Sequence, residues 1–149
     1  MKKLIICLAF FLTAVSLVFP QNGFMVNTYN DSTQRDPQIA EDSEGNFVVV
    51  WDSENQISST SQSDLYFQKF NSNNEKVGVE TLINESTSGE QEKPALAMNP
   101  SGDFIVAWAS HTGDFESIFD VKAKIYKSTG ETTTEFLVNT YTDHSQTNP

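Results

Sequence analysis

The chain of 149 residues carries 20 acidic against 9 basic side chains, which gives a formal net charge of −11. Such a charge repels the phosphates of nucleic acids and of anionic membranes, so neither is expected as a partner. The single cysteine, Cys7, lies near the amino terminus, and the rest of the sequence offers no thiol for a disulfide or a metal site.

Residues 1–20 have the pattern of a secretory signal peptide. Lys2 and Lys3 precede an apolar run from Leu4 through Val18, which is short for a membrane span. We therefore expect an exported protein, secreted or held at the cell surface, with no membrane insertion once the leader is removed. Loss of the two lysines leaves 7 basic against 20 acidic side chains, a net charge of −13 (7 − 20).

The remainder, residues 21–149, repeats one pattern with a period of about 57 residues. Its clearest landmark is Gly-x-Phe-Val/Ile-Val-x-Trp, which ends at Trp51 and again at Trp108 (108 − 51 = 57). A period of this size indicates stacked copies of one supersecondary unit. We place repeat units at approximately residues 24–80 and 81–135, with an incomplete third unit at 136–149 that reaches the proline of the next copy at Pro149.

Each complete copy is predicted to contain four short strands joined by turns. In the strand that ends at the first tryptophan, Phe47, Val49 and Trp51 alternate with Val48 and Val50. Both faces of this strand are apolar, so both must be covered in the fold.

One turn position and one further apolar segment also recur. Asn74 and Gly130 occupy one aligned turn position (130 − 74 = 56), which predicts a left-handed backbone there. The segment Phe24–Thr28 recurs as Thr81–Glu85 and Phe136–Thr140, and we expect the chain to enter its first strand between Gln21 and Thr28.

Four antiparallel strands per repeat, with a central strand that is apolar on both faces, are typical of β-propeller blades. The predicted fold is therefore all-β, with two blades plus the start of a third. A two-sheet β-sandwich stays open as the alternative, because a propeller needs four or more blades to close. We interpret Trp51 and Trp108 as core rather than as a platform for sugars, so replacement of either by alanine is predicted to cost about 3–5 kcal/mol.

A resemblance rests on the order and spacing of several motifs. Pro-x-Ile-Ala at 37–40, Gly-Asn-Phe-Val-Val-Val-Trp at 45–51, Leu-Tyr-Phe-Gln-Lys-Phe at 65–70 and Val-Asn-Thr-Tyr at 26–29 follow one another. Together they resemble a propeller-like tandem repeat of large bacterial secreted and cell-surface proteins. The resemblance covers nearly everything after the leader and implies an adhesin-type context without a shared enzymatic activity.

Oxygen-rich side chains alternate in two turns, as they do in calcium loops. The full Asp-x-Asp-x-Asp-Gly loop and its distal glutamate are absent, and hairpin turns favour Asp, Asn, Ser and Gly for backbone reasons alone. We therefore favour turn chemistry over a calcium site and assign no metal ligand. The residues concerned are Asp42, Glu44 and Asn46 in one turn and Asn99, Ser101 and Asp103 in the other.

A nucleophile and base could be imagined at Ser110, His111 and Asp114. The equivalent of His111 in the first copy is Glu54 (111 − 57 = 54), and His144 lies in a different loop class. We interpret both histidines as solvated loop residues and assign no catalytic or cofactor-binding residue.

The function expected from the sequence is a non-catalytic secreted or cell-surface repeat module for adhesion or protein/carbohydrate interaction, as a fragment of a longer protein. Its partner would be a protein or a glycan, no cofactor is expected, and self-association to complete a ring stays open. The alternative is part of the propeller of a secreted carbohydrate-active enzyme.

Overall fold

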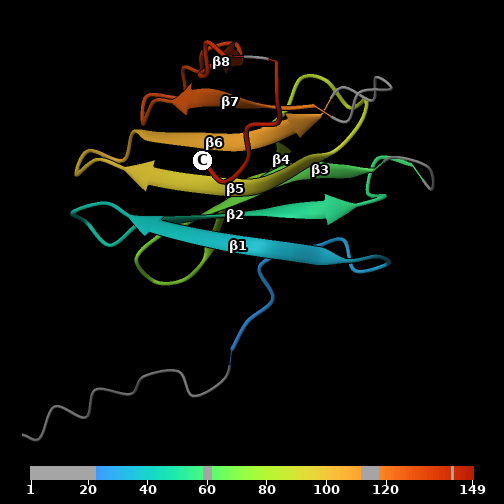
Figure 1. Ribbon diagram of the computed structural model, residues 1–149. Coiled ribbons are helices and arrows are strands. Elements are labelled where there is room, and N and C mark those ends of the chain that lie inside the picture. Colours follow the sequence, from blue (N-terminus) through green and yellow to red (C-terminus); the bar gives the residue numbers. More distant parts are fainter. Residues whose placement is uncertain (1–22, 59–61, 112–117, 142) are drawn as a thin grey trace, which may run out of the picture.

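The computed structural model describes residues 23–58, 62–111, 118–141 and 143–149. Within these residues it contains eight β-strands and no helix (Figure 1). The leader expected at residues 1–20 lies outside the described residues. The strands are β1 (Gln34–Glu41), β2 (Phe47–Glu54), β3 (Ser63–Phe70), β4 (Lys76–Leu82), β5 (Gln91–Met98), β6 (Phe104–His111), β7 (Phe119–Tyr126) and β8 (Phe136–Leu137).

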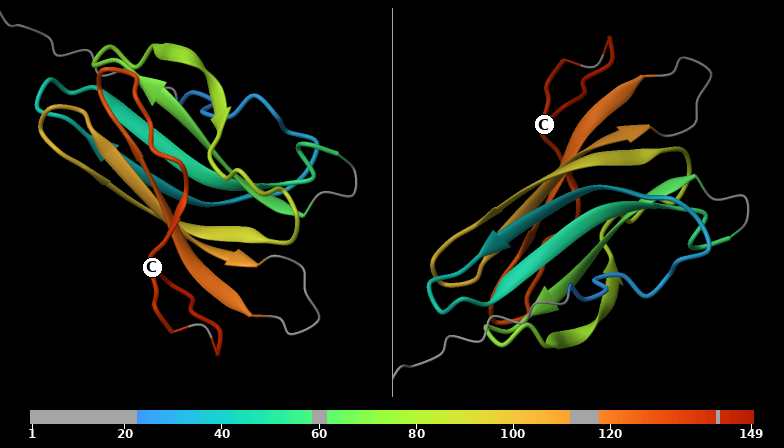
Figure 2. Two further views of the ribbon diagram at one scale, coloured as in Figure 1. Left: turned by 90° about the horizontal axis from the view of Figure 1, so that it is seen from above. Right: turned by 90° about the horizontal axis from the view of Figure 1, so that it is seen from below.

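The strands form two antiparallel sheets of four strands each, in the order of the chain: β1 to β4 in the first sheet and β5 to β8 in the second. The views in Figure 2 show the two sheets as separate layers. The predicted all-β class and the four strands per repeat are confirmed. β5 contacts β1, β2 and β3, whereas the described parts of β4 and β8 do not contact each other, so the sheets approach most closely at β5.

The central strands have the two apolar faces that the sequence predicts. In the first sheet Trp51 is paired with Tyr66, and Val50 is paired with Phe67, on opposite faces. Directly paired residues share a face of an antiparallel sheet, so the pairing assigns each side chain to one layer of the core. We call the face that carries the tryptophan of each sheet its front face and the opposite face its back face.

The two sheets stack with the front face of the second on the back face of the first. One buried cluster joins the first sheet to side chains of the second sheet. The first sheet contributes Val48, Val50, Leu65 and Phe67, and Ile83, which follows β4, also belongs to the cluster. The partners from the second sheet are Phe104, Val106, Trp108 and Tyr126. Trp108 is 0% exposed, which confirms the prediction that this indole is core.

The front face of the first sheet is covered by the amino-terminal segment. Val26 packs against the cluster that contains Trp51, and the rings of Phe24 and Phe70 are 5.3 Å apart. The prediction that the chain enters its first strand before residue 28 is wrong for the described residues 23–28, which form no strand. The fourth strand beside β3 is β4, and the amino-terminal segment lies over the indole instead of pairing with a strand.

The first strand of each sheet carries the same irregularity. The register shifts between Arg35 and Gln38 in β1 and between Glu92 and Ala95 in β5. The residues in front of the two prolines, Asp36 and Lys93, have positive φ values of 49° and 55°, and Asn148, in front of Pro149, has a φ of 64°. A bulge accommodates a proline in a strand because proline has no N–H to donate.

The aligned turn position has the predicted left-handed backbone in both copies. Asn74 has a φ of 65° and Gly130 a φ of 97°. The hairpins between the first two strands of each sheet use glycine in the same way, with a φ of 81° at Gly45 and 84° at Gly102. The asparagine and the glycines at these turn positions are therefore explained by backbone geometry.

Gly102→Ala is expected to lower the free energy of unfolding by about 1–2 kcal/mol, because an L-residue is strained at this positive φ. The new Cβ would also lie 3.3 Å from Oδ2 of Asp42. Urea denaturation followed by circular dichroism measures the loss. Gly23→Ala is the control, because nothing lies within 4 Å of a Cβ built there. Equal stability of the two variants would contradict the assigned turn geometry.

Candidate functional site

A cleft of about 330 Å³ opens where hairpin turns of the two sheets lie side by side. The backbone N–H of Ser43 donates to the carbonyl of Pro100 at 3.2 Å, and the Ser43 hydroxyl donates to the same oxygen at 2.8 Å. The two residues are repeat equivalents (100 − 43 = 57). The hairpins therefore stack in register, and the cleft is built by both copies.

The cleft combines apolar side chains with acidic ones. Val48 and Phe104 are buried, Met98 is half-buried, and all three line the cleft together with Asp42 and Glu44. This mixture of an apolar wall and a few polar groups is common in ligand sites, and the volume is at the lower end of their range.

One cation lies in this cleft. Nζ of Lys69 is 5.4 Å from the centre of the Phe104 ring and 5.8 Å from that of Phe67. These distances allow cation–π attraction across the junction of the two sheets. Lys69 thus joins the sheets at the cleft and contributes a positive charge opposite the acidic turn.

Asp42 and Asn99, two of the residues considered for calcium, accept hydrogen bonds within their own turns. Oδ1 of Asp42 accepts from the backbone N–H groups of Glu44 at 2.8 Å and Asn46 at 3.0 Å, and Oδ2 accepts from the Asn46 side chain at 2.9 Å. The hydrogen bond from the Asn46 side chain, followed by those from the turn backbone, lowers the pKa of Asp42. Oδ1 of Asn99 likewise accepts from the N–H groups of Ser101 and Asp103, both at 3.0 Å.

Asp103 connects its turn to the next hairpin of the same sheet. It accepts a hydrogen bond from the backbone N–H of Ser128 at 2.9 Å and forms an ion pair with Lys127 at 3.1 Å. The Ser128 hydrogen bond first, and then the Lys127 ammonium, lower the pKa of Asp103 to about 2. Within the residues that the structure describes, no three His, Cys, Asp or Glu side chains form a group that could hold a metal ion.

Asp103→Asn is expected to weaken the acid sensitivity of the fold. A carboxyl whose pKa is lowered by folding stabilises the protein above its unfolded pKa, and this stabilisation is lost as the pH falls through the folded value. For Asp103 that window runs from the ordinary value of 3.8 down to about 2. Thermal unfolding at pH 7, 4, 3 and 2 should therefore show a smaller drop in Tm for the variant than for the parent. Asp31→Asn is the control, because Asp31 is exposed and makes no hydrogen bond to the described residues; the same flattening in both variants would contradict the assignment.

The side chains considered for hydrolysis do not form a catalytic pair in the described residues. Ser110 is 2% exposed and its hydroxyl has no hydrogen-bond partner there. The prediction that His111 is a solvated loop residue is wrong, because His111 is the last residue of β6 and its Nε2 atom is buried. The His111 ring lies 5.2 Å from that of Phe119, and the third candidate, Asp114, lies outside the described residues. His144 contacts Tyr141, whose hydroxyl is 3.1 Å from Nδ1.

Sequence reasoning missed a buried polar network at the end of the sheets opposite the hairpins. The Ser- and Gln-rich composition of residues 52–63 predicts a loop, but β2 continues to Glu54 and β3 begins at Ser63. Asp52, Ser53 and Asp64 are each 0% exposed. The prediction is wrong for residues 52–54 because buried hydrogen-bond partners can hold polar side chains inside a sheet. The recurrence of Asp64 as Asp120 (120 − 64 = 56) is the signal that could have revealed the network.

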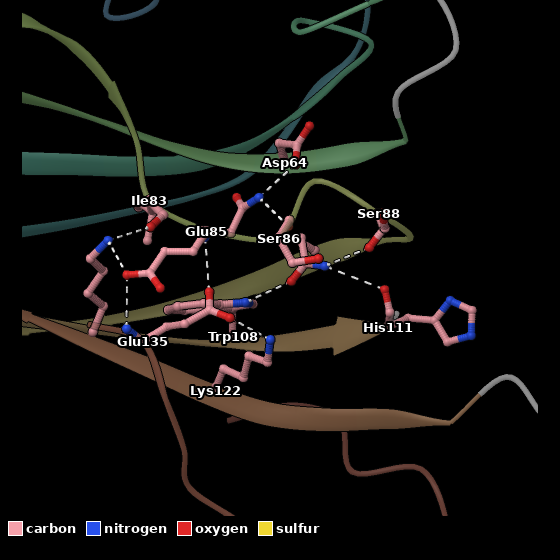
Figure 3. A network of polar contacts seen from close by, with 12 residues as sticks. Asp64, Ile83, Glu85, Ser86, Ser88, Trp108, His111, Lys122 and Glu135 are labelled. Carbon is pink, nitrogen blue, oxygen red and sulfur yellow. Dashed lines mark hydrogen bonds and ion pairs between the residues drawn. The ribbon is translucent and has the colours of Figure 1, made fainter. Parts of the chain in front are cut away.

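An asparagine joins the fourth strand of each sheet to the start of the third. Asn84 accepts from the backbone N–H of Leu65 at 2.8 Å. It donates to Oδ1 of Asp64 at 2.7 Å and to the carbonyl of Ser86 at 2.9 Å (Figure 3). We call this set of three hydrogen bonds the asparagine clamp. The second sheet repeats it in full: Asn139 binds the N–H of Val121 at 2.7 Å, Asp120 at 2.8 Å and the carbonyl of Tyr141 at 2.8 Å.

Both tryptophans are held by a glutamine from the first strand of their own sheet. Nε1 of Trp51 donates to Gln34 at 2.9 Å, and Nε1 of Trp108 donates to Gln91 at 3.0 Å. This bond satisfies the polar atom of an otherwise buried indole. The indoles are therefore unavailable as platforms for a ligand.

Ion pairs hold the chain between the two sheets. Lys124 donates to the carbonyl of Ile83 and pairs with Glu85, both at 3.2 Å, and Lys122 pairs with Glu135 at 2.6 Å (Figure 3). Burial acts to raise the pKa of Glu135, but the Lys122 ammonium and the N–H of Glu85 outweigh it and the pKa is lowered. The lysines of β7 thus face the first sheet as structural groups.

Comparison with models of protein families, with curated proteins and with solved structures finds no match for this chain. The part of the chain that the structure describes has no helix that could cross a membrane.

Proposed function

We propose that this chain is a non-catalytic binding module of an exported protein and that the cleft between the stacked hairpins contacts a protein ligand. The observation that carries the proposal is that the cleft is built by equivalent turns of both repeats, with an apolar wall beside acidic groups. Repeat surfaces of this kind present variable turns on a constant core.

The architecture that we propose for the module is a pair of adjacent β-propeller blades. Each sheet is a four-stranded meander, and the front face of the second covers the back face of the first. Close approach at the first strand and separation at the fourth is the arrangement of blades that fan out from an axis.

A protein ligand fits the cleft better than a glycan does. Sugars commonly stack on exposed aromatic faces, but Trp51, Trp108 and Phe104 are only 4%, 0% and 2% exposed. The acidic turn with Asp42 and Glu44, on a chain of net charge −11, attracts basic side chains. Half-buried Met98 and exposed Val77, which also line the cleft, accommodate aliphatic ones. A peptide segment that alternates basic and apolar residues therefore has the complementary chemistry.

The test uses a capped peptide of alternating lysine and leucine as the probe and one of alternating glutamate and leucine as its control. Amide chemical shifts of the chain from Gln21 to Pro149 are followed by NMR during titration. We expect the basic peptide to move the resonances of residues 42–46 and 99–103, and the effect to weaken with added salt.

Glu44→Gln should reduce the affinity for the basic peptide. Asp31→Asn removes one negative charge near the start of β1, far along the strand from the hairpin, and should leave the affinity almost unchanged. Equal loss in both variants would show attraction by net charge alone. That result, or shifts that avoid both turns, would overturn the proposed site.

A further inference from the structure

The amino-terminal segment Phe24–Thr28 has the sequence of a fourth strand but belongs to neither sheet. It shares Phe-x-Val-Asn-Thr with Phe136–Thr140, which supplies β8 and the clamp residue Asn139 in the second sheet. In sequence Asn27 is therefore the third clamp asparagine, placed ahead of the first sheet.

Asn27 makes one of the three hydrogen bonds of a clamp. Its side chain donates to the carbonyl of Tyr29 at 2.6 Å, as Asn84 does to Ser86 and Asn139 to Tyr141. No strand N–H and no aspartate lies at Asn27 among the described residues, so the other two positions of this clamp are unfilled.

The segment makes the same contacts with the first sheet as the chain between the two sheets makes with the second sheet. The N–H of Thr28 donates to Glu80 at 2.7 Å. Glu85, the repeat equivalent of Thr28, donates through its N–H to Glu135 at 3.0 Å. Val26 covers the front face of the first sheet, and its equivalent Ile83 lies in the cluster beneath the front face of the second. The contact differs from the one between the two sheets in that no sheet of the described residues lies against the front face of the first sheet.

The front face of the first sheet matches the front face that already packs between the sheets. Phe47, Val49 and Trp51 are the equivalents of Phe104, Val106 and Trp108, each displaced by 57 positions (104 − 47). Phe104, Val106 and Trp108 pack on the back face of the first sheet, which is another copy of the same repeat. The back face of the second sheet, which carries Ile105 and Ala107, is therefore the surface of this chain that corresponds to the missing sheet.

The resident fourth strand of the second sheet is short and exposed. β8 has two residues, and Phe136, Leu137 and Val138 are 41%, 49% and 51% exposed. A strand with so little burial is replaced at low cost by a segment of the same sequence.

We propose that residues 24–28 of one copy of this chain replace residues 136–140 beside β7 of a second copy. Asn27 then forms a full clamp with Asp120 and the N–H of Val121 of the second copy, and the front face of the first sheet lies on the back face of that copy's second sheet. The contact is head-to-tail, so it builds a ring where the rotation closes and a chain of copies where it does not.

Sedimentation velocity of the chain from Gln21 to Pro149, over a range of concentrations, gives the association constant. Asn27→Ala removes the incoming clamp and should weaken association about tenfold. Asn139→Ala releases the resident strand and should strengthen association. Strand exchange would be overturned if the association constant changed in the same direction in both variants, or if Asn27→Ala associated like the parent. Association would then be explained by nonspecific contact between apolar surfaces.

A disulfide trap tests the register directly. Lys122 is paired with Leu137, whose equivalent in the amino-terminal segment is Met25. Mixing the Met25→Cys variant with the Lys122→Cys variant under oxidising conditions should give a mixed covalent dimer. Val79→Cys replaces Met25→Cys in the control mixture, because Val79 is 79% exposed on β4. Equal yields of mixed dimer in the two mixtures, or none in the first, would overturn the register.

Discussion

Trp108→Ala is expected to lower the free energy of unfolding by about 4–5 kcal/mol, at the upper end of the range for removal of a large buried aromatic side chain. The indole is 0% exposed, lies in the cluster that joins the two sheets and donates its Nε1–H to Gln91. Its removal leaves a cavity at the junction and takes away the hydrogen bond that Oε1 of the buried Gln91 accepts. Urea denaturation followed by far-ultraviolet circular dichroism measures the change.

Trp51→Ala is the comparison within the same chain. Trp51 has the same hydrogen bond and the same place in its sheet, but a short segment rather than a whole sheet covers it. We expect a smaller loss, about 3 kcal/mol, because the segment can collapse onto the space. A loss below about 1 kcal/mol for Trp108→Ala would show that the sheets are not held together by this residue.

The repeat pattern predicted the apolar part of the fold because it follows from alternation alone. Val48 and Val50 alternate with Trp51 and Val49 along one strand, and a strand that is apolar on both sides needs a layer on each. The left-handed turn at Asn74 could be predicted for a similar reason, because few residues other than Asn and Gly exchange at such a position. Local rules of this kind need no knowledge of distant contacts.

The polar network could not be predicted in this way. Asp64 and Asn84 are separated by 20 positions (84 − 64), and each resembles an ordinary loop residue in its own surroundings. Only the folded sheet brings them to 2.7 Å. The prediction for residues 24–28 failed for a related reason. Their strand pattern does not show which strand they pair with, and the place beside β3 belongs to β4.

We propose different roles for the two ends of the sheets, ligand binding at the hairpin end and stability or assembly at the opposite end. The hairpin end carries turns that stack through Ser43 and Pro100 and leave a cleft between them. The opposite end carries the clamps that join one strand to the next. A substitution at the clamps should change stability or assembly, whereas a substitution on the rim of the cleft, such as Glu44→Gln, should change ligand binding alone.

Asn84→Ala is expected to lower the free energy of unfolding by about 3 kcal/mol, because it leaves a buried carboxylate and a buried N–H without their partner. Asp64 is 0% exposed and Asn84 3% exposed, and the Leu65 N–H has the Asn84 side chain as its acceptor. Asn139→Ala removes the same three hydrogen bonds at a half-buried position and should cost about 1 kcal/mol. Chemical denaturation of both variants checks this order, and equal losses would contradict it.

The pH dependence of the Asn84→Ala deficit identifies its cause. Burial raises the pKa of Asp64, while the hydrogen bond from Asn84 opposes that shift. A carboxyl with a raised pKa in the folded state binds a proton more readily there, so acidification through that pKa relieves the cost of burying its charge. Without Asn84 the pKa of Asp64 rises further, and the deficit measured at pH 7 should shrink as the pH is lowered toward the ordinary value of 3.8. A deficit that stays constant over this range would mean that the lost Leu65 hydrogen bond, rather than the Asp64 carboxylate, accounts for the whole effect.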